Sequence, residues 1–173
     1  MALSTPALAD TLTLGEPIPD LQIDNLGEIQ LSDDEVSYTP WQLDVPDKKV
    51  HVLQYMAGTM SASKLNSPFT DALKDGIDYS GYYVTTIINL DDAMWGSKGF
   101  VRAEIEKNKR RYPLSSLILD DEGIGKETWN IDDKTSTIVV ADSSGSIIYL
   151  KHGAMSEDEI ERTLELIKTE IGS

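Results

Sequence analysis

The sequence predicts an α/β protein with a mixed central sheet flanked by helices and an N-terminal β-hairpin extension. A short apolar run from Val50 to Met56 is typical of a strand that is buried on both faces of a parallel sheet. An amphipathic helical pattern follows it, and a second β-rich run spans Tyr82 to Leu90, which together indicate a parallel crossover. Closer to the C-terminus, two β-rich runs flank the turn residues 142–145, as in an antiparallel hairpin.

Length and composition exclude several functions. A chain of 173 residues with 40% hydrophobic residues can form one good core, so we expect a single domain over residues 12–173 behind a disordered tail of residues 1–11. The net charge of -15 repels a phosphate backbone, and we expect no nucleic-acid partner. The lack of cysteine excludes thiol catalysis and thiolate metal sites, and two histidines cannot form a histidine-rich site. We therefore expect no cofactor and no metal.

The sequence also bears on the presence of membrane-spanning and signal-peptide segments. No apolar run approaches the roughly 18 residues that a membrane span needs. Ala7-Leu8-Ala9 has the small-x-small form that precedes a signal-peptidase cut, but no basic and apolar regions stand before it. This stretch is either a disordered N-terminus or the tail of a signal peptide.

The N-terminal quarter predicts a hairpin followed by a long connection. Two alternating segments within residues 12–31 flank Asn25-Leu26-Gly27, a turn signal between apolar runs, so we expect a β-hairpin there. Residues 32–49 are acidic and interrupted by prolines, and we expect a long loop with at most one brief strand.

The helix that follows the Val50 strand has clear start and stop signals. Thr59 or Ser61 can cap its first turn, and Gly76 can end it. Pro68 falls inside the pattern, so we expect a kink at that position. The apolar residues recur at helical spacing: Ala62, Leu65, Phe69, Ala72 and Leu73.

The C-terminal half predicts a loop over residues 91–99, a helix over 100–111 and a short strand over 114–119. The helix ends in a basic cluster, Lys107, Lys109, Arg110 and Arg111, which either complements the helix dipole or docks an acidic partner. The run Asp120 to Gly123 lacks the alternating ligands of an EF-hand, so we expect a solvated turn. Ser156 and Glu159 form a capping box for a last amphipathic helix.

Several stretches resemble known proteins. Gly15-Glu16-Pro17-Ile18-Pro19-Asp20 resembles the opening of extended thioredoxin-fold proteins, and Lys151-His152-Gly153-Ala154-Met155-Ser156 is similar to the passage that leads a thioredoxin into its last helix. More narrowly, LQYMAGTMSASKLN, TTIINLDDA, FVRAEIEKNKRRYP and STIVVADSSG together resemble the YtfJ family of exported bacterial proteins. The resemblance implies a thioredoxin-like fold and a periplasmic location, and it favours a signal-peptide tail at residues 2–9. Some family members are labelled transcriptional regulators, but the acidic charge and the lack of a helix-turn-helix pattern argue against that activity here.

The resemblance to thioredoxins also shows which activity the chain lacks. Counting back from Pro68 puts Met60 and Ser63 where a thioredoxin carries its two cysteines. A thioether forms no thiolate, and Ser63 has no base nearby in sequence, so thiol–disulfide exchange is impossible. The position of the thioredoxin cis-proline falls near Ser136, where we expect a trans peptide bond because a cis bond before a residue other than proline costs about 2.5–4 kcal/mol.

Two candidate binding surfaces remain. The first is the degenerate thioredoxin site, made of a helix N-terminus and a facing loop, which could bind an anion or an extended peptide. Its residues are Thr59, Met60, Ser61, Ser63 and Ser136. In the simpler interpretation, these hydroxyls only cap their own helix. The second and weaker candidate is the loop with Asp91, Asp92 and Trp95, in which Trp95 either anchors a partner or folds back over the core. We assign Trp41 and Trp129 to packing.

The sequence therefore predicts a redox-inactive binding or chaperone-like protein of the periplasm, with a periplasmic protein or peptide as its partner. One alternative is a hydrolytic or metal-dependent enzyme that uses Asp91, Asp92 and Asp120 near the strand ends. Another is an assembly component that pairs through a sheet edge or through the hairpin of residues 12–31. The residues single out no ligand and no oligomeric state.

Overall fold

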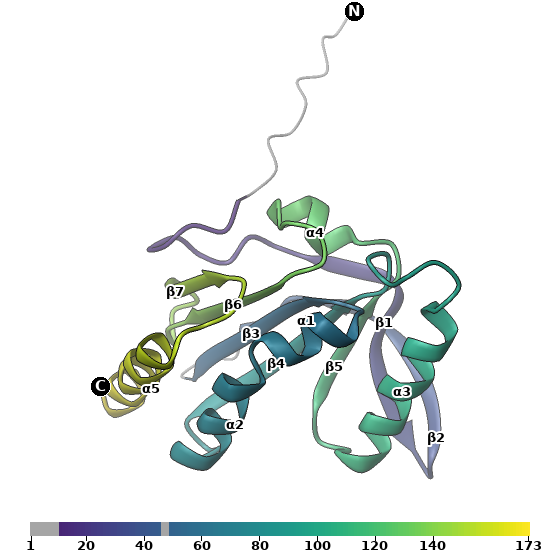
Figure 1. Ribbon diagram of the computed structural model, residues 1–173. Helices are drawn as coiled ribbons and strands as arrows, with labels where there is room; N and C mark the ends of the chain where they lie inside the picture. The colour runs from purple at the N-terminus through teal and green to yellow at the C-terminus, as the bar shows by residue number, and fades with distance from the viewer. Residues whose placement is uncertain (1–10, 46–48) are drawn as a thin grey trace, which may run out of the picture.

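Seven strands form one mixed sheet in the computed structural model, which describes residues 11–45 and 49–173 (Figure 1). The strand order is β2-β1-β5-β4-β3-β6-β7, in which β3, β4 and β5 run parallel and the other pairs are antiparallel. The strands are Gln22–Ser32 (β1), Glu35–Gln42 (β2), Val50–Ala57 (β3), Tyr82–Asn89 (β4), Ser116–Asp120 (β5), Ser136–Ala141 (β6) and Ile147–His152 (β7). The predicted mixed sheet is confirmed, whereas residues 1–10 of the predicted tail lie outside the described residues.

Five helices accompany the sheet in the described part of the chain, and none of them is long and apolar enough to cross a membrane. The helices are Met60–Leu65 (α1), Ser67–Gly76 (α2), Lys98–Arg111 (α3), Ile124–Trp129 (α4) and Glu157–Gly172 (α5). The capping box of α5 is present as predicted, because Ser156 Oγ accepts from the Glu159 N–H and the Glu159 carboxylate accepts from the Ser156 N–H. The six-residue helix α4 has no counterpart in the sequence prediction.

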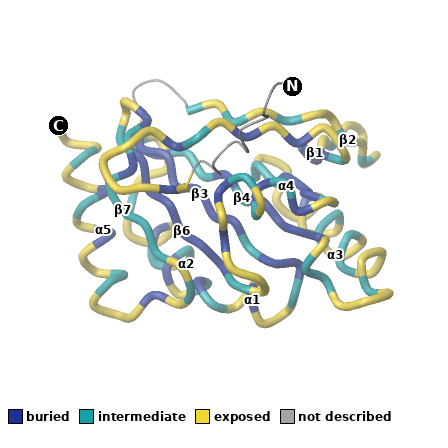
Figure 2. The backbone as a smooth tube through the Cα atoms, turned by 90° about the horizontal axis from the view of Figure 1, so that it is seen from above, coloured by how far each residue is buried: buried dark blue, intermediate teal, exposed yellow. Residues whose placement is uncertain are grey.

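Alternate residues of β3 divide the core between the two faces of the sheet. Leu53 and Tyr55 face the cluster that contains Trp129 of α4 and the N-terminal segment before β1. Val50 and Val52 face the opposite side, where they pack with α2 and α5, while α3 covers a third cluster around Ile88 of β4. The buried strands lie between these layers, as the dark tube of Figure 2 shows. A sheet that is buried on both faces explains the apolar run in β3.

The N-terminal hairpin is confirmed, but it lies about ten residues later than predicted. β1 and β2 pair around the turn residues Asp33 and Asp34, both at positive φ, and β2 occupies part of the expected long loop. The sequence signal at Leu26-Gly27 marks an irregularity inside β1, where both residues have positive φ. A Cβ at Gly27 would lie 2.2 Å from the Thr39 carbonyl oxygen. A bulge and a turn both call for residues that tolerate positive φ, so the signal alone does not separate them.

The expected single helix with a kink at Pro68 is wrong, because the chain forms two helices. α1 ends before Asn66, which leaves the helical region with φ -115° and ψ 15°, and α2 begins at Ser67. Pro68 lies in the first turn of α2, where its missing N–H breaks no helical hydrogen bond. The proline therefore starts the second helix.

Candidate functional site

The two candidate surfaces meet in one open hollow of about 550 Å³ at the C-terminal ends of β3 and β4. Its lining includes the start of α1, the loop after β4 and the loop before β6. We call it the α1 hollow; its residues are Thr59, Met60, Ser61, Asp92, Ala93, Met94, Trp95 and Lys134. Ser63, Asp91 and Ser136 do not line it. The structure thus joins five of the predicted residues that the sequence assigned to two separate sites.

The hydroxyls at the start of α1 serve their own helix. Thr59 Oγ1 accepts from the Ala62 N–H at 3.2 Å, which makes Thr59 the N-cap, and it lies 3.2 Å from Ser61 Oγ. Ser63 Oγ donates to the Met60 carbonyl at 2.9 Å. These contacts match the simpler interpretation, in which the hydroxyls cap a helix that is only six residues long.

Ser136 is buried in a polar junction beneath the surface. Its Oγ accepts from Gln54 Nε2 and from Asn66 Nδ2, both at 3.1 Å, and the described residues contain no cis peptide bond. The Asn66 amide also donates to the Gly153 carbonyl and accepts from the Met155 N–H, each at 3.1 Å. Ser136 therefore helps to connect β6, the α1–α2 junction and the segment before α5. The sequence did not predict this role of Asn66. The one local sign of a helix break there is its position two residues before Pro68.

Large apolar side chains rise around the α1 hollow. Met60 is 69% exposed, Met94 is 76% exposed and Trp95 is fully exposed. Trp95 therefore does not fold back over the core, and the interpretation as an anchor for a partner remains. Trp129 is buried edge-on to Tyr55 at 6.0 Å between ring centroids, and Trp41 packs partly buried against the same core cluster, so both packing assignments are confirmed.

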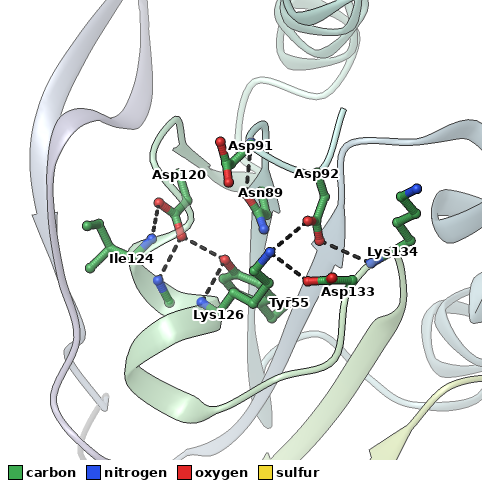
Figure 3. A network of polar contacts seen from close by, with 10 residues as sticks. Tyr55, Asn89, Asp91, Asp92, Asp120, Ile124, Lys126, Asp133 and Lys134 are labelled. Carbon is green, nitrogen blue, oxygen red and sulfur yellow. Dashed lines mark hydrogen bonds and ion pairs between the residues drawn. The ribbon is translucent and has the colours of Figure 1, made fainter. Parts of the chain in front are cut away.

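An ionic network holds the loop after β4 against the loop before β6 (Figure 3). The Asp92 carboxylate accepts from Lys126 Nζ at 2.9 Å and from the Lys134 N–H at 3.1 Å. Lys126 Nζ also donates to Asp133 at 2.8 Å. The hydrogen bonds to Asp133 and Asp92 raise the pKa of Lys126 above its usual value. The network fixes the two loops that carry Trp95 and Lys134.

The Asp120 side chain caps the first turn of helix α4, so the expectation that Asp120 belongs to a solvated turn is wrong. This buried carboxylate accepts from the Ile124 and Gly125 N–H groups at 2.9 and 2.8 Å, and from the Tyr55 hydroxyl at 2.7 Å (Figure 3). The Tyr55 oxygen in turn accepts from the Lys126 N–H at 2.9 Å. Burial, followed by the negative charge of Asp120, raises the pKa of Tyr55 far above its usual value. Asp120 was expected in a surface turn because Asp-Asp-Glu-Gly is a turn pattern, but it is the last residue of β5 and its side chain faces inward.

The three carboxylates of the enzyme alternative do not form one site. Asp120 bonds to Tyr55 and α4, whereas Asp92 bonds to Lys126 and Lys134. The Asp91 N–H donates to the Asn89 side chain at 2.9 Å, and Asp91 does not line the hollow. Within residues 11–45 and 49–173, no group of three or more histidine or acidic side chains is placed to hold a metal ion. The geometry does not favour a hydrolytic or metal-dependent site.

The fold resembles that of known thiol–disulfide proteins. A crystal structure described as a putative thiol:disulfide interchange protein DsbE from Chlorobium tepidum superposes with a TM-score of 0.64 at 15% identity, and the match covers 94% of this chain and all of that one. The likeness shows a thioredoxin-like fold and nothing about activity. This chain contains no cysteine.

Two relatives in sequence are uncharacterised proteins that align over nearly their whole length. The uncharacterized protein YtfJ of Escherichia coli is 35% identical over 97% of this chain and 92% of its own length. An uncharacterized protein of Haemophilus influenzae is 32% identical over 95% of this chain and 90% of its own length. The family described as "Bacterial protein of unknown function (YtfJ_HI0045)" matches residues 12–170. The chain is therefore a member of the YtfJ_HI0045 family of bacterial proteins.

Proposed function

We propose that this protein is a redox-inactive binding protein of the periplasm, which holds an extended apolar segment of a partner protein in the α1 hollow. The observation that carries the proposal is the set of exposed side chains Met60, Met94 and Trp95 around that hollow. Fully exposed tryptophan is uncommon on a protein surface, and tryptophan is enriched among the residues that dominate binding energy. The periplasmic location rests on the resemblance at the sequence level and on the motif Ala7-Leu8-Ala9.

The chemistry of the hollow supports binding rather than catalysis. Met60 occupies the place of the reactive thiol, and its thioether is neither a nucleophile nor a base. Thr59 and Ser63 hydrogen-bond within α1, and neither histidine of the chain lines the hollow. The carboxylate of Asp92 is held by Lys126 and Lys134. No group in the hollow is therefore set up to transfer a proton or to attack a substrate.

The side chains suit partners of varied sequence. Methionine is flexible and polarisable, so Met60 and Met94 can adapt to different apolar residues. Trp95 offers a large rigid surface on a loop that the Asp92 network holds in place. A partner segment that covers these three side chains removes exposed apolar area from water at about 25 cal/mol per Å².

The test is the binding of a permanently unfolded protein, reduced and carboxymethylated α-lactalbumin, measured by isothermal titration calorimetry. We expect saturable binding that the double substitution Met94→Ala and Trp95→Ala weakens by about tenfold or more. Both residues are exposed, so the variant should keep its fold, which circular dichroism verifies. Phe100→Ala is the matched control, because Phe100 is 74% exposed on α3 and lies outside the hollow. No saturable binding, or equal weakening by Phe100→Ala, contradicts the proposal.

A further inference from the structure

A second pocket of about 600 Å³ lies on the sheet between α2 and α3, and it shares no lining residue with the α1 hollow. We call it the α2–α3 pocket. Its floor is formed by β3, β4 and β5, and its walls are formed by one side of each helix and by the loop of residues 112–115. Figure 1 shows α2 and α3 in front of the sheet on either side of this position. The volume falls within the range of about 300–1,000 Å³ that is usual for small-molecule sites.

The pocket exists because two core clusters on this face do not meet. One cluster gathers under α2 and α5, and the other gathers under α3. Between them, Val84 and Thr86 of β4 remain only half-buried, although β4 is the middle strand of seven. A central strand normally has both faces covered by other elements. The pocket is therefore a gap between α2 and α3 in the helical layer, with the sheet exposed at its floor.

The interior of the α2–α3 pocket is mainly apolar. The side chains that form it come from three strands and two helices, and they are Met56, Leu73, Val84, Ile88, Ile105 and Leu117. Tyr82 also lines the pocket, and its buried hydroxyl has no hydrogen-bond partner within the described part of the chain. The six apolar side chains suit a ligand with an apolar body.

The rim of the pocket is positively charged. Lys74 and Arg111 are exposed lining residues, and each lies 6.0 Å from the centre of the Tyr112 ring. Neither has an ion pair among the residues that the structure describes, and no Asp or Glu lines the pocket. This absence is notable in a chain with 30 acidic and 15 basic residues. An apolar interior with a cationic rim fits an anion that carries an apolar tail.

The basic cluster at the end of α3 also favours an anionic ligand. Lys107 pairs with Glu104, Arg110 pairs with Asp34, and Lys109 is buried and donates to the Ser115 carbonyl. Arg111 alone in this cluster is left without such a partner among the described residues and faces the pocket. The prediction of cations at a helix C-terminus is confirmed for Lys109, Arg110 and Arg111, which lie in the last turn of α3, and Arg111 also lines the pocket.

We propose that the α2–α3 pocket binds a fatty acid, with the acyl chain on the apolar floor and the carboxylate between Lys74 and Arg111. The guanidinium of Arg111 can bind a carboxylate through two N–H groups, and Lys74 adds a second positive charge. The proposal is independent of the α1 hollow, because the two sites share no lining residue.

The test is a calorimetric titration of the whole chain with laurate below its micelle concentration. We expect saturable binding that Arg111→Glu weakens by about tenfold or more, whereas Lys107→Glu leaves it within about twofold. Both substitutions change the charge by the same amount on the same helix, and Lys107 does not line the pocket. Val84→Trp fills the pocket and should abolish binding, provided that circular dichroism shows an intact fold. Acetate, which has the same head group and no tail, should not bind.

Three results overturn the proposal. Laurate that does not bind saturably excludes a fatty-acid site. Equal weakening by Arg111→Glu and Lys107→Glu means that only the net charge matters. Acetate that binds as well as laurate means that the apolar floor contributes nothing.

Discussion

At the scale of single residues, buried polar side chains hold the site region together. Asn66 is 1% exposed, yet its amide makes three hydrogen bonds that reach Ser136, Gly153 and Met155. Each of these partners is at least 70 positions away in sequence. The side chain therefore joins the break between α1 and α2 to β6 and to the segment before α5. The sequence could not reveal this role, because Asn66 falls inside the expected single helix and its partners lie far away along the chain.

Replacing Asn66 with Ala should destabilise the fold strongly. The substitution leaves the Gly153 carbonyl and the Met155 N–H unpaired in a buried setting, and we expect a loss of about 2–4 kcal/mol in the free energy of unfolding. Urea unfolding measures this loss. Ser67→Ala is the control, since its exposed hydroxyl donates only to the Lys64 carbonyl, and it should cost less than about 0.5 kcal/mol. Equal costs for the two variants would show that the Asn66 junction is unimportant.

His51 is a second buried polar residue with a measurable effect. Its Nε2 lies 2.9 Å from Thr85 Oγ1, and its buried Nδ1 has no partner in the described part of the structure. Burial lowers the pKa of His51 from 6.5 to about 4. Between these pH values the unfolded chain binds a proton that the folded chain does not bind. Stability therefore falls as the pH drops from 6.5 towards 4, and it is fully present above pH 6.5.

The variant His51→Gln should lack this part of the pH dependence. A shift from 6.5 to about 4 corresponds to about 3 kcal/mol over that window. Urea unfolding at a series of pH values should give a steeper loss of stability in acid for the original chain than for the variant. Parallel curves for the two proteins would mean that His51 is protonated equally in the folded and unfolded states.

At the scale of elements, local patterns predicted some segments and missed others for physical reasons. The strands β3 and β4 and the helix α5 were predictable because their apolar spacing and capping box are local. Helix α4 was not predictable from local patterns. The N–H groups of its first turn donate to the Asp120 carboxylate and to the Tyr55 hydroxyl oxygen, and Tyr55 lies 71 positions before Lys126. The hairpin turn was expected at Leu26-Gly27 for a similar reason. Thr39 of β2 approaches Gly27 closely, and this position is a bulge inside β1 instead of a turn.

The packing of α4 gives a prediction at this scale. A Cβ on Gly125 would lie 2.4 Å from Cε2 of Tyr55, so Gly125→Ala must displace the ring or the helix. We expect a loss of about 1–3 kcal/mol in the free energy of unfolding, as for other overpacked cores. Gly99→Ala is the matched control in α3, where a Cβ meets nothing within 4 Å, and it should stabilise the protein by about 0.5 kcal/mol. Equal effects of the two substitutions in urea unfolding would contradict the tight contact.

At the scale of the whole molecule, the chain keeps a thioredoxin-like scaffold without its reactive sulfur atoms. The sequence could place Thr59, Met60 and Ser61 at a helix start and Trp95 in a loop at the strand ends. It could not show that they share one hollow, because more than 30 positions separate them and the sheet register brings them together. The α2–α3 pocket escaped prediction for the same reason, since the distance between two helices on a sheet is not a local property.

The proposed function requires that this scaffold binds partner chains through the α1 hollow. The most direct measurement is a map of backbone amide chemical shifts by NMR as unfolded carboxymethylated α-lactalbumin is added to the isotope-labelled protein. We expect the largest shifts at residues 59–61 and 93–95, and we expect the Met94→Ala and Trp95→Ala double variant to need about tenfold more ligand to reach them. Largest shifts along α2 and α3, or shifts that persist unchanged in the double variant, would contradict the proposed function.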